Sequence, residues 1–388
     1  MKQSQSLLYG GIVYSEEGGI SLRYFNYVTP DEEKALFYLP PTSFYNHSDK
    51  EILASSVGAA LYMPATRPTI AEDIAFGKIE GLVSAIFDLE DAVGENEVHA
   101  AEESLIHQMN KLAAFIELGI LRSDNLPLLF VRVRSANQLN YLIERLEENV
   151  AILTGFVFPK FTAENGEAYF QILENYNDEK SSASPTLYGL PILESEAIIY
   201  KEFRYPSLQA IKEIVEKYKD LVLNVRIGAT DFSSLYGLRR SPDMTIYDIA
   251  PIRDCVSDII NVFGRMDSSY VISGPVWEYF PRKGLIREVI MDKENGLIGK
   301  TIIHPTHIKP VQSLYTVTHE EYVDATSIIA KNNGDYGVIK SQYGNKMNEI
   351  KPHLNWARRI MLRSQIYGVL HEQQQYFGLL SIQDRAYV

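Results

Sequence analysis

The sequence predicts an α/β protein built as a (β/α)₈ TIM barrel, with a β-rich extension before the barrel and a helical tail after it. Between Ser56 and about His307, eight short apolar runs alternate with amphipathic stretches. Strands that alternate with helices pair in parallel, and eight parallel strands are the number that closes a TIM barrel. An open doubly wound sheet is the competing architecture, but no G-x-G-x-x-G motif follows the first run.

The predicted strands are short runs rich in apolar, β-branched and aromatic residues. In chain order they occupy residues 59–64, 83–88, 128–133, 155–160, 187–193, 221–228, 270–274 and 301–305. The segments between them are predicted helices. The clearest example carries apolar residues at helical spacing: Leu208, Ile211, Ile214, Val215 and Tyr218.

The two ends of the chain differ from the barrel in character. Residues 1–55 are rich in Tyr and Phe and are broken by Gly and Pro, which indicates short strands and turns. Beyond the barrel the chain becomes helical, first from Glu320 and again from Pro352. We therefore predict an N-terminal extension (1–55), a barrel (56–315) and a C-terminal helical extension (316–388).

Composition excludes several classes of partner. The 388 residues carry a net charge of −13, which argues against nucleic acid and anionic membranes as partners, because both attract basic surfaces. A local basic pocket for a small anionic substrate remains compatible with this charge. The single cysteine, Cys255, excludes an internal disulfide and fits a reducing compartment. With no signal peptide and no apolar run of membrane-spanning length, we expect a cytoplasmic protein.

Two carboxylates stand where successive predicted strands end. Glu194 follows the apolar run that ends at Leu193, and Asp231 follows the run that ends near Ile227. Catalytic groups of TIM barrels gather at this edge of the sheet. Mg²⁺ typically binds one or two protein carboxylates and takes its other ligands from water and substrate oxygens. The sequence therefore predicts a Mg²⁺ site formed by Glu194 and Asp231.

Three further predicted strands also end in polar groups. For any one carboxylate among them, a helix N-cap or a solvated loop is the more common explanation, and Asp91 could simply complement the dipole of the next helix. Several carboxylates and arginines on one rim nevertheless favour a site, because the arginine fork holds carboxylates at two points. These groups are the cluster Asp88, Glu90 and Asp91, the pair Arg132 and Arg134, and Lys160.

Seven short motifs occur in order at these strand ends: P-A-T-R-P with Arg67, D-L-E-D-A-V, V-R-V, F-P-K, I-L-E-S, I-G-A-T-D-F and G-K-T-I-I-H-P. Over about residues 56–362 the chain thus resembles the citrate lyase β-subunit-like (HpcH/HpaI-type) superfamily of TIM-barrel C–C bond lyases. The extension and the late N-K-M-N-E-I-K-P-H from Asn345 are similar to a bacterial branch associated with tellurium-resistance and stress gene clusters.

The resemblance implies a role for each matching residue. By this resemblance Glu194 and Asp231 would bind Mg²⁺. Arg132 would contact the carboxylate or carbonyl oxygen of a 2-oxo-acid substrate. Glu90 and Asp91 would hold metal-bound waters and Arg132. Arg67 falls where the family contacts an acyl-CoA substrate.

The resemblance also implies a homo-oligomer. In several family lyases a late carboxylate from a neighbouring subunit supplies acid/base chemistry, and the nearest match here is Glu349 in M-N-E-I-K-P. The chain departs from the family pattern elsewhere. Arg134 replaces a common Asn, His307 replaces the usual Gln, and Arg239 and Arg240 are additional. These arginines favour a more anionic substrate, with a phosphorylated compound as an alternative to CoA.

Two residue types allow other interpretations. The H-P-T-H spacing of His304 and His307 suits structural histidines better than metal ligands. Lys160 is a candidate Schiff-base lysine, but its place beside two metal-type carboxylates favours a charge or hydrogen-bond role in substrate binding.

These observations predict a Mg²⁺-dependent C–C bond lyase or aldolase that acts on a 2-oxo-acid or hydroxy-acyl substrate, with a CoA thioester among the candidates. The metal would stabilise an enolate as a Lewis acid, and Arg132 would orient the fragment. One alternative is an acyl-thioester hydrolase that uses the same metal site. The other is a non-catalytic barrel that binds a metabolite or serves in assembly.

Overall fold

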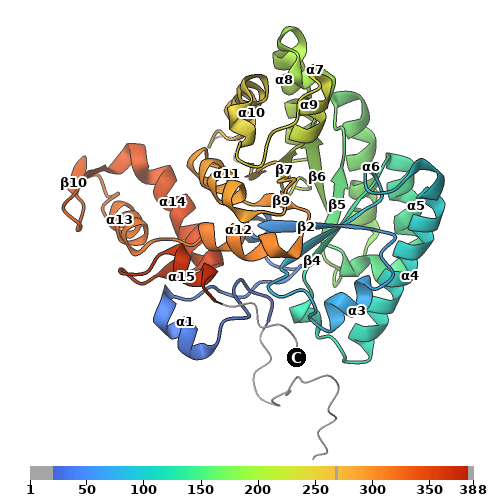
Figure 1. Ribbon diagram of the computed structural model, residues 1–388, viewed down its shortest axis with the longest axis horizontal. Coiled ribbons are helices and arrows are strands. Elements are labelled where there is room, and N and C mark those ends of the chain that lie inside the picture. Colours follow the sequence, from blue (N-terminus) through green and yellow to red (C-terminus); the bar gives the residue numbers. More distant parts are fainter. Residues whose placement is uncertain (1–20, 267–269, 383–388) are drawn as a thin grey trace, which may run out of the picture.

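Eight parallel strands form the central sheet of the computed structural model, which describes residues 21–266 and 270–382. The strand order is β8-β7-β6-β5-β4-β3-β2-β9, and a parallel bridge between Gly274 and Lys300 joins the two ends into a barrel (Figure 1). The prediction of a TIM barrel is confirmed. The strands are β2 (Ala59–Pro64), β3 (Ser84–Asp88), β4 (Leu128–Arg132), β5 (Gly155–Phe158), β6 (Tyr188–Leu193), β7 (Val225–Ile227), β8 (Ile272–Ser273) and β9 (Lys300–Ile302).

A helix follows each strand and packs on the outside of the barrel (Figure 1). Every residue of β3, β4, β5 and β6 is buried, as expected of parallel strands that are covered on both sides. The helices are α3 (Ile70–Ala75), α4 (Val98–Glu117), α5 (Ala136–Leu146), α6 (Ala163–Glu179), α7 (Glu196–Ile199), α8 (Lys201–Lys217), α9 (Ala229–Leu235), α10 (Ala250–Phe263), α11 (Arg282–Glu294) and α12 (Ile308–Leu314).

The described part of the N-terminal extension contains more helix than we predicted. Residues 21–56 form α1 (Pro30–Leu36), the short strand β1 (Phe37–Leu39) and α2 (Lys50–Ser56). Helix α1 begins at Thr29, which forms a reciprocal capping box with Glu32 and is followed by a proline at the first helical position. These start signals outweigh the aromatic composition that suggested strands. The motif Y-G-G-I-V-Y lies outside the described residues.

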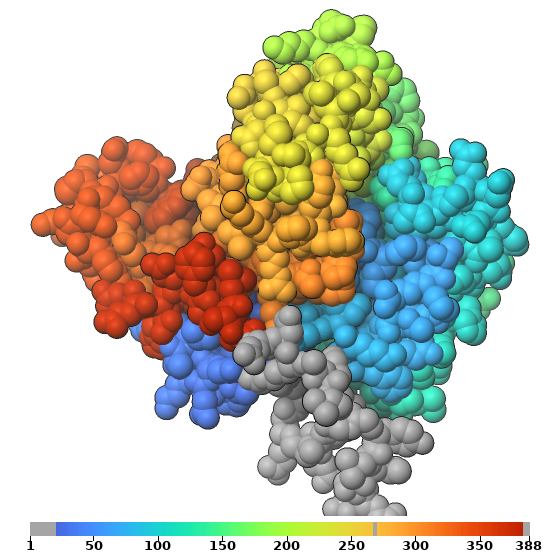
Figure 2. All heavy atoms as spheres, in the orientation of Figure 1, coloured from blue at the N-terminus to red at the C-terminus, as the bar shows by residue number. Residues whose placement is uncertain are grey.

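The C-terminal extension is largely helical, as predicted, and packs against the N-terminal segment. It comprises α13 (His319–Ala330), the hairpin β10 (Val338–Lys340) and β11 (Met347–Glu349), α14 (Ile350–Tyr367), β12 (Val369–Leu370) and α15 (Tyr376–Leu380). Strand β12 pairs antiparallel with β1. Figure 2 shows the dark blue and red segments as one continuous surface beside the barrel.

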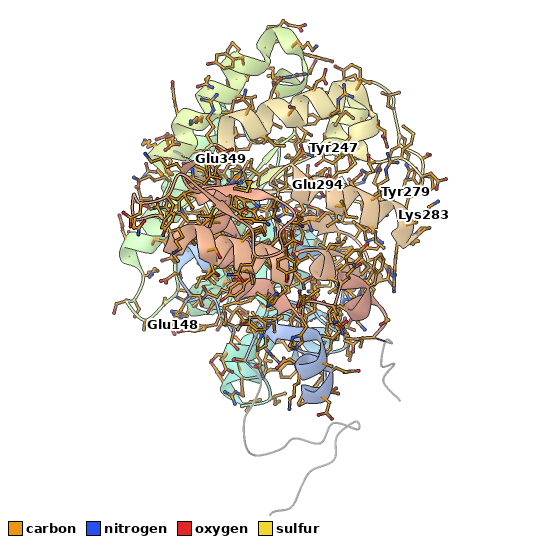
Figure 3. All side chains as sticks on the ribbon, turned by 90° about the vertical axis from the view of Figure 1, so that its left-hand side faces the viewer. Glu148, Tyr247, Tyr279, Lys283, Glu294 and Glu349 are labelled. Atoms are coloured by element: carbon orange, nitrogen blue, oxygen red, sulfur yellow. The ribbon has the colours of Figure 1, made fainter. Side chains whose placement is uncertain are left out.

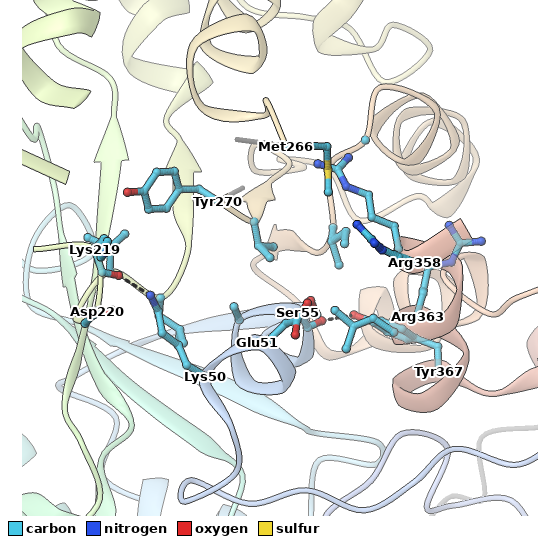
Figure 4. A pocket seen from close by; sticks show the side chains of 18 of the residues that line it. Lys50, Glu51, Ser55, Lys219, Asp220, Met266, Tyr270, Arg358, Arg363 and Tyr367 are labelled. Atoms are coloured by element: carbon cyan, nitrogen blue, oxygen red, sulfur yellow. Dashed lines mark hydrogen bonds between the residues drawn. The ribbon is translucent and has the colours of Figure 1, made fainter. Parts of the chain in front are cut away.

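Both flanking segments cover the N-terminal end of the barrel strands. The Tyr24 hydroxyl donates to the carbonyl oxygen of Ser56, just before β2, and the Tyr24 ring lies 4.3 Å from that of Tyr367. A cavity of about 640 Å³ lies at this end, between α2 and α14, and Figure 4 shows Lys50 and Arg358 among its lining side chains. None of the predicted site carboxylates lines this cavity.

A buried cluster of charges joins β9 to α11. The ammonium of Lys300 lies 2.8 Å from a carboxylate oxygen of Glu288 and 2.8 Å from one of Asp292. All three residues are fully buried. The guanidinium of Arg240 also pairs with Glu288, and the Tyr247 hydroxyl donates to Asp292. Because each charge has an opposite neighbour, the cluster is tolerated away from water.

None of the helices in the described part of the chain combines the length and the apolar character needed to cross a membrane.

Candidate active site

The strand ends of β3 and β4 carry a two-point ion pair between Asp88 and Arg132. The two residues lie opposite one another in the parallel register. The Nε and Nη2 atoms of Arg132 donate to the two Asp88 carboxylate oxygens at 2.7 and 2.6 Å. Its third nitrogen, Nη1, lies 3.0 Å from carboxylate oxygens of both Glu90 and Asp91. Sequence reasoning noted Asp88 in the rim cluster but gave it no role.

These contacts fix the charge and the direction of Arg132. Burial by itself would lower the pKa of this guanidinium, but the hydrogen-bonded Asp88 carboxylate outweighs burial and holds the pKa above its ordinary value. Asp88 also accepts hydrogen bonds from the backbone N–H groups of Glu90 and Ala92, so one carboxylate positions both the arginine and the following loop. The guanidinium carbon of Arg132 lies 5.2 Å from the centre of the Tyr62 ring.

Glu194, directly after β6, packs closely against Gly228. A Cβ atom at position 228 would lie 1.9 Å from a Glu194 carboxylate oxygen, so a glycine is required there. The other carboxylate oxygen accepts a hydrogen bond from the Lys160 backbone N–H at 2.8 Å. Burial, together with the nearby charge of Asp231, raises the pKa of Glu194 to about 8.

This pair has the donor chemistry that Mg²⁺ requires. Two carboxylates with cavity on one side suit an ion that keeps water and substrate ligands. Burial is the larger cause of the raised pKa of Glu194 and the charge of Asp231 the smaller one, and a bound divalent cation would lower this pKa. Within residues 21–266 and 270–382, no three His, Cys, Asp or Glu side chains cluster in a metal-binding arrangement.

Lys160 follows β5 with a backbone φ of +47°, a left-handed conformation that is uncommon outside glycine. Its ammonium pairs with Glu90 and lies 3.7 Å from Asp91 and 4.0 Å from Asp231. Burial lowers the pKa of this lysine, but the carboxylates outweigh burial and raise it above its usual value. A Schiff-base lysine needs a lowered pKa to be nucleophilic at neutral pH, so the geometry favours the charge role.

A cavity of about 430 Å³ lies at the carboxyl ends of the strands. Its lining includes Asp88, Asp91, Arg132, Glu194 and Asp231. Glu90 and Lys160 do not line it, but Glu90 pairs with Arg132 and Lys160 lies near Asp91, and both of these do. Residues at the ends of β3, β4 and β6 and in the first turn of α9 thus meet in one place, as expected of the catalytic end of a TIM barrel.

Arg67 and Arg134, two of the predicted site residues, are engaged in other contacts. The Arg67 side chain is 45% exposed and pairs with Asp73 at 2.7 Å. The Arg134 guanidinium donates to the backbone carbonyl oxygens of Leu89, Glu90 and Val93, and so holds the loop after β3. Neither lines the cavity, and their roles in substrate binding remain predictions.

Glu349 is exposed at the start of α14, on the β10–β11 hairpin. Its described hydrogen bond runs from its own backbone N–H to His353. Figure 1 places this hairpin on the side of the C-terminal extension that faces away from the barrel, and Figure 3 labels Glu349 there. The chain does not bring Glu349 to its own cavity.

The additional arginines and the histidines have structural contacts. Arg240 is buried and pairs with Glu288, whereas Arg239 is 71% exposed. His307 is buried, and burial lowers its pKa to about 4. Burial likewise raises the pKa of the Cys255 thiol to about 12, which agrees with a packing role.

Sequence reasoning missed two cavity-lining residues, Tyr62 on β2 and Arg226 on β7. Arg226 had a signal: it interrupts an otherwise apolar run and stands two residues before Gly228, on the same face of the strand.

A family model described as a C–C bond lyase of the TIM-barrel fold matches residues 51–369. The chain belongs to this family. Membership in the TIM-barrel C–C bond lyases supports the resemblance to the citrate lyase β-like superfamily and covers the barrel and most of α13 to β12. No curated protein matches the sequence.

Solved structures related to this lyase family share the fold. The protein CitE from Mycobacterium tuberculosis, in complex with magnesium, acetoacetate and coenzyme A, is 20% identical, with a TM-score of 0.52. The match covers 80% of this chain and 99% of that one. A citrate lyase from Burkholderia xenovorans LB400 is 15% identical, with a TM-score of 0.59, over 84% of this chain and 96% of that one.

Proposed function

We propose that the protein is a Mg²⁺-dependent C–C bond lyase or aldolase that acts on a 2-oxo-acid or hydroxy-acyl substrate. One observation carries this proposal: the Glu194–Asp231 pair and the oriented, charged Arg132 face a single cavity of about 430 Å³. A metal pair beside a fixed guanidinium suits a fragment that has a carbonyl and a carboxylate. Family membership supports the reaction class.

Glu194 and Asp231 would hold Mg²⁺, which as a Lewis acid would polarise the substrate carbonyl and stabilise the negative charge that develops when the C–C bond breaks. Arg132 would bind the carboxylate or carbonyl oxygen of the fragment, in an orientation already set by Asp88. Glu90 and Asp91 would keep Arg132 in place and order water beside the metal pair. Lys160 would offset negative charge at the rim.

The proton would be moved by Glu349 of a neighbouring subunit, so that the active form is a homo-oligomer. An exposed carboxylate on a hairpin that points away from its own barrel is available to another copy. If no neighbour supplies it, water at the metal is the other candidate acid or base. Cleavage and the reverse condensation use the same groups.

The substrate would be a small anionic molecule, and a CoA thioester is one candidate. In support, the fold-related Mycobacterium tuberculosis protein holds magnesium, acetoacetate and coenzyme A. The late N-K-M-N-E-I-K-P-H motif supports membership in the branch associated with tellurium resistance.

Proton exchange tests the proposal directly. The protein with Mg²⁺ and pyruvate or oxaloacetate in D₂O should catalyse exchange of the C3 hydrogens, followed by NMR, and EDTA should stop it. Cleavage of an acyl-CoA thioester without exchange would favour the hydrolase alternative. Binding of a 2-oxo acid with neither exchange nor cleavage would favour a non-catalytic barrel.

A further inference from the structure

Arg226 is a buried cation in the wall of the candidate active site, and the described chain supplies no carboxylate to balance it. The residue is 1% exposed and lines the cavity from β7. Burial lowers the pKa of its guanidinium; the Tyr62 hydroxyl opposes this shift, and the nearby charge of Arg132 adds to it. The other buried arginines behave differently: Arg132, Arg204 and Arg240 each pair with a carboxylate.

The contacts of Arg226 are with hydroxyl-bearing residues that also line the cavity. Its Nη2 donates to Thr301 Oγ1 at 2.6 Å, whereas Nε and Nη1 have no partner of ordinary hydrogen-bond geometry. Its guanidinium carbon lies 5.9 Å from the centre of the Tyr62 ring, the same ring that Arg132 contacts. Because the Thr301 oxygen accepts from Arg226, the Thr301 O–H is oriented to donate elsewhere.

An isolated buried charge is costly unless something pairs with it. In Arg132 the charge is already matched by Asp88, Glu90 and Asp91. The charge of Arg226 has no carboxylate partner among the described residues, and the open space beside this side chain is the cavity. An anionic group of a bound ligand is therefore the partner that the site lacks.

We propose that Arg226, with the hydroxyl groups of Tyr62 and Thr301, forms a second anion-binding subsite, which selects substrates that carry a negative group in addition to the 2-oxo-acid carboxylate. The hydroxyl groups donate to that second group, and Arg226 behind them supplies the balancing charge. The proposal rests on the proposed function, because Arg132 and the metal pair bind the first carboxylate. The second group is a carboxylate or a phosphate.

The test compares three probes by calorimetry in Mg²⁺: pyruvate with one carboxylate, oxaloacetate with two, and 3-phosphonopyruvate with a phosphonate. The parent protein should prefer one of the dianionic probes to pyruvate, and the preferred probe identifies the second group. Arg226→Met should reduce that preference roughly 10- to 100-fold, the range expected for a lost hydrogen bond to a charged group. Arg226→Lys should keep part of it.

Matched variants separate this role from general electrostatics and from folding. Arg239→Met removes an exposed cation and should leave the preference unchanged. Thr301→Val and Tyr62→Phe keep the guanidinium and should each reduce the preference, which provides a test if Arg226→Met does not fold.

An unchanged preference in Arg226→Met, with both classes of probe still bound, overturns this inference but leaves the proposed function standing. If Arg226→Met fails to fold and the Thr301 and Tyr62 variants keep the full preference, the inference is likewise overturned. If the parent binds neither pyruvate nor the dianionic probes, the proposed function fails and the inference fails with it.

Discussion

Arg132 and Asp88 occupy opposite positions in the β3–β4 register and share two hydrogen bonds, so neighbouring strands fix both the position and the plane of the guanidinium. A lysine cannot reproduce this geometry, because its ammonium is a point charge without a planar fork. We therefore expect Arg132→Lys to lose 2-oxo-acid affinity while it retains Mg²⁺ binding. Calorimetry with each ligand checks this, and undiminished oxaloacetate binding would move the role to another residue, with Arg226, which lines the same cavity, the first to examine.

The metal pair is tested by Glu194→Ala and Asp231→Ala. Each change removes one of two carboxylates, so each should abolish Mg²⁺ binding at millimolar concentrations while circular dichroism remains native. A ligand that binds only the native state raises its stability, so the melting temperature of the parent should rise with Mg²⁺ and that of the variants should not. Glu196→Ala, on the exposed start of α7, serves as the control. Parent-like Mg²⁺ affinity in both variants would eliminate the assignment.

Glu349→Gln should keep Mg²⁺ binding and assembly but lower turnover by roughly 10²–10⁴-fold, as expected for a lost general acid or base. Mixing it with Asp231→Ala protein should restore part of the activity, because some sites then combine an intact barrel with an intact Glu349. Activity assays before and after subunit exchange measure this. No rescue would mean that Glu349 acts within its own chain or has no catalytic role.

Lys300→Met should destabilise the fold by about 3–5 kcal/mol, because it leaves the buried Glu288 and Asp292 without their shared cation. The matched control is Lys283→Met. The Lys283 side chain is 92% exposed, and its ion pair with Asp243 at 3.8 Å should contribute less than about 1 kcal/mol. Urea unfolding of both variants measures the difference. An equal loss of unfolding free energy in Lys300→Met and Lys283→Met would show that the stability of the buried cluster does not depend on Lys300.

His307 should make the protein sensitive to acid. Its pKa falls from the ordinary 6.5 to about 4 on burial, so the unfolded chain takes up a proton that the native state does not between these values. The free energy of unfolding should therefore fall as the pH is lowered from 6.5 towards 4. His307→Gln removes this group, so its urea midpoint should decline less steeply over the same pH range. If the urea midpoints of the parent and of His307→Gln decline equally with falling pH, the prediction is wrong.

The barrel was predictable from the sequence because buried parallel strands appear as nearly continuous apolar runs. Residues 59–64 were predicted as a strand and form β2. The strand predicted at residues 221–228 is longer than the observed strand β7. Val222 makes a single bridge to Gly189, and the regular strand begins at Val225. Strand ends are poorly defined by hydrophobicity, because apolar residues continue into the flanking turns.

Individual side-chain roles were harder to predict, because they depend on where each strand stops. Arg132 and Arg134 look equivalent in V-R-V-R. Strand β4 ends at Arg132, and Arg134 instead reaches the carbonyl oxygens of the preceding loop. The N-terminal extension carried a local helix signal in the Thr29–Glu32 capping box, but its packing had no such signal. Its aromatic residue Tyr24 packs on Tyr367, a contact between positions 343 residues apart that no local pattern reveals.

The pairing of β1 with β12 sets the order in which the chain can fold during synthesis. Strand β1 ends at Leu39, but its partner residues, Val369 and Leu370, leave the ribosome only after the whole barrel has been made. Because contacts between distant segments form slowly, the N-terminal segment must wait until the barrel is complete. Until then Tyr24 lacks its contact with Tyr367, and β1 lacks its partner strand. The final docking step thus joins the first and last parts of the chain, and truncation of either one would leave the other without its partner.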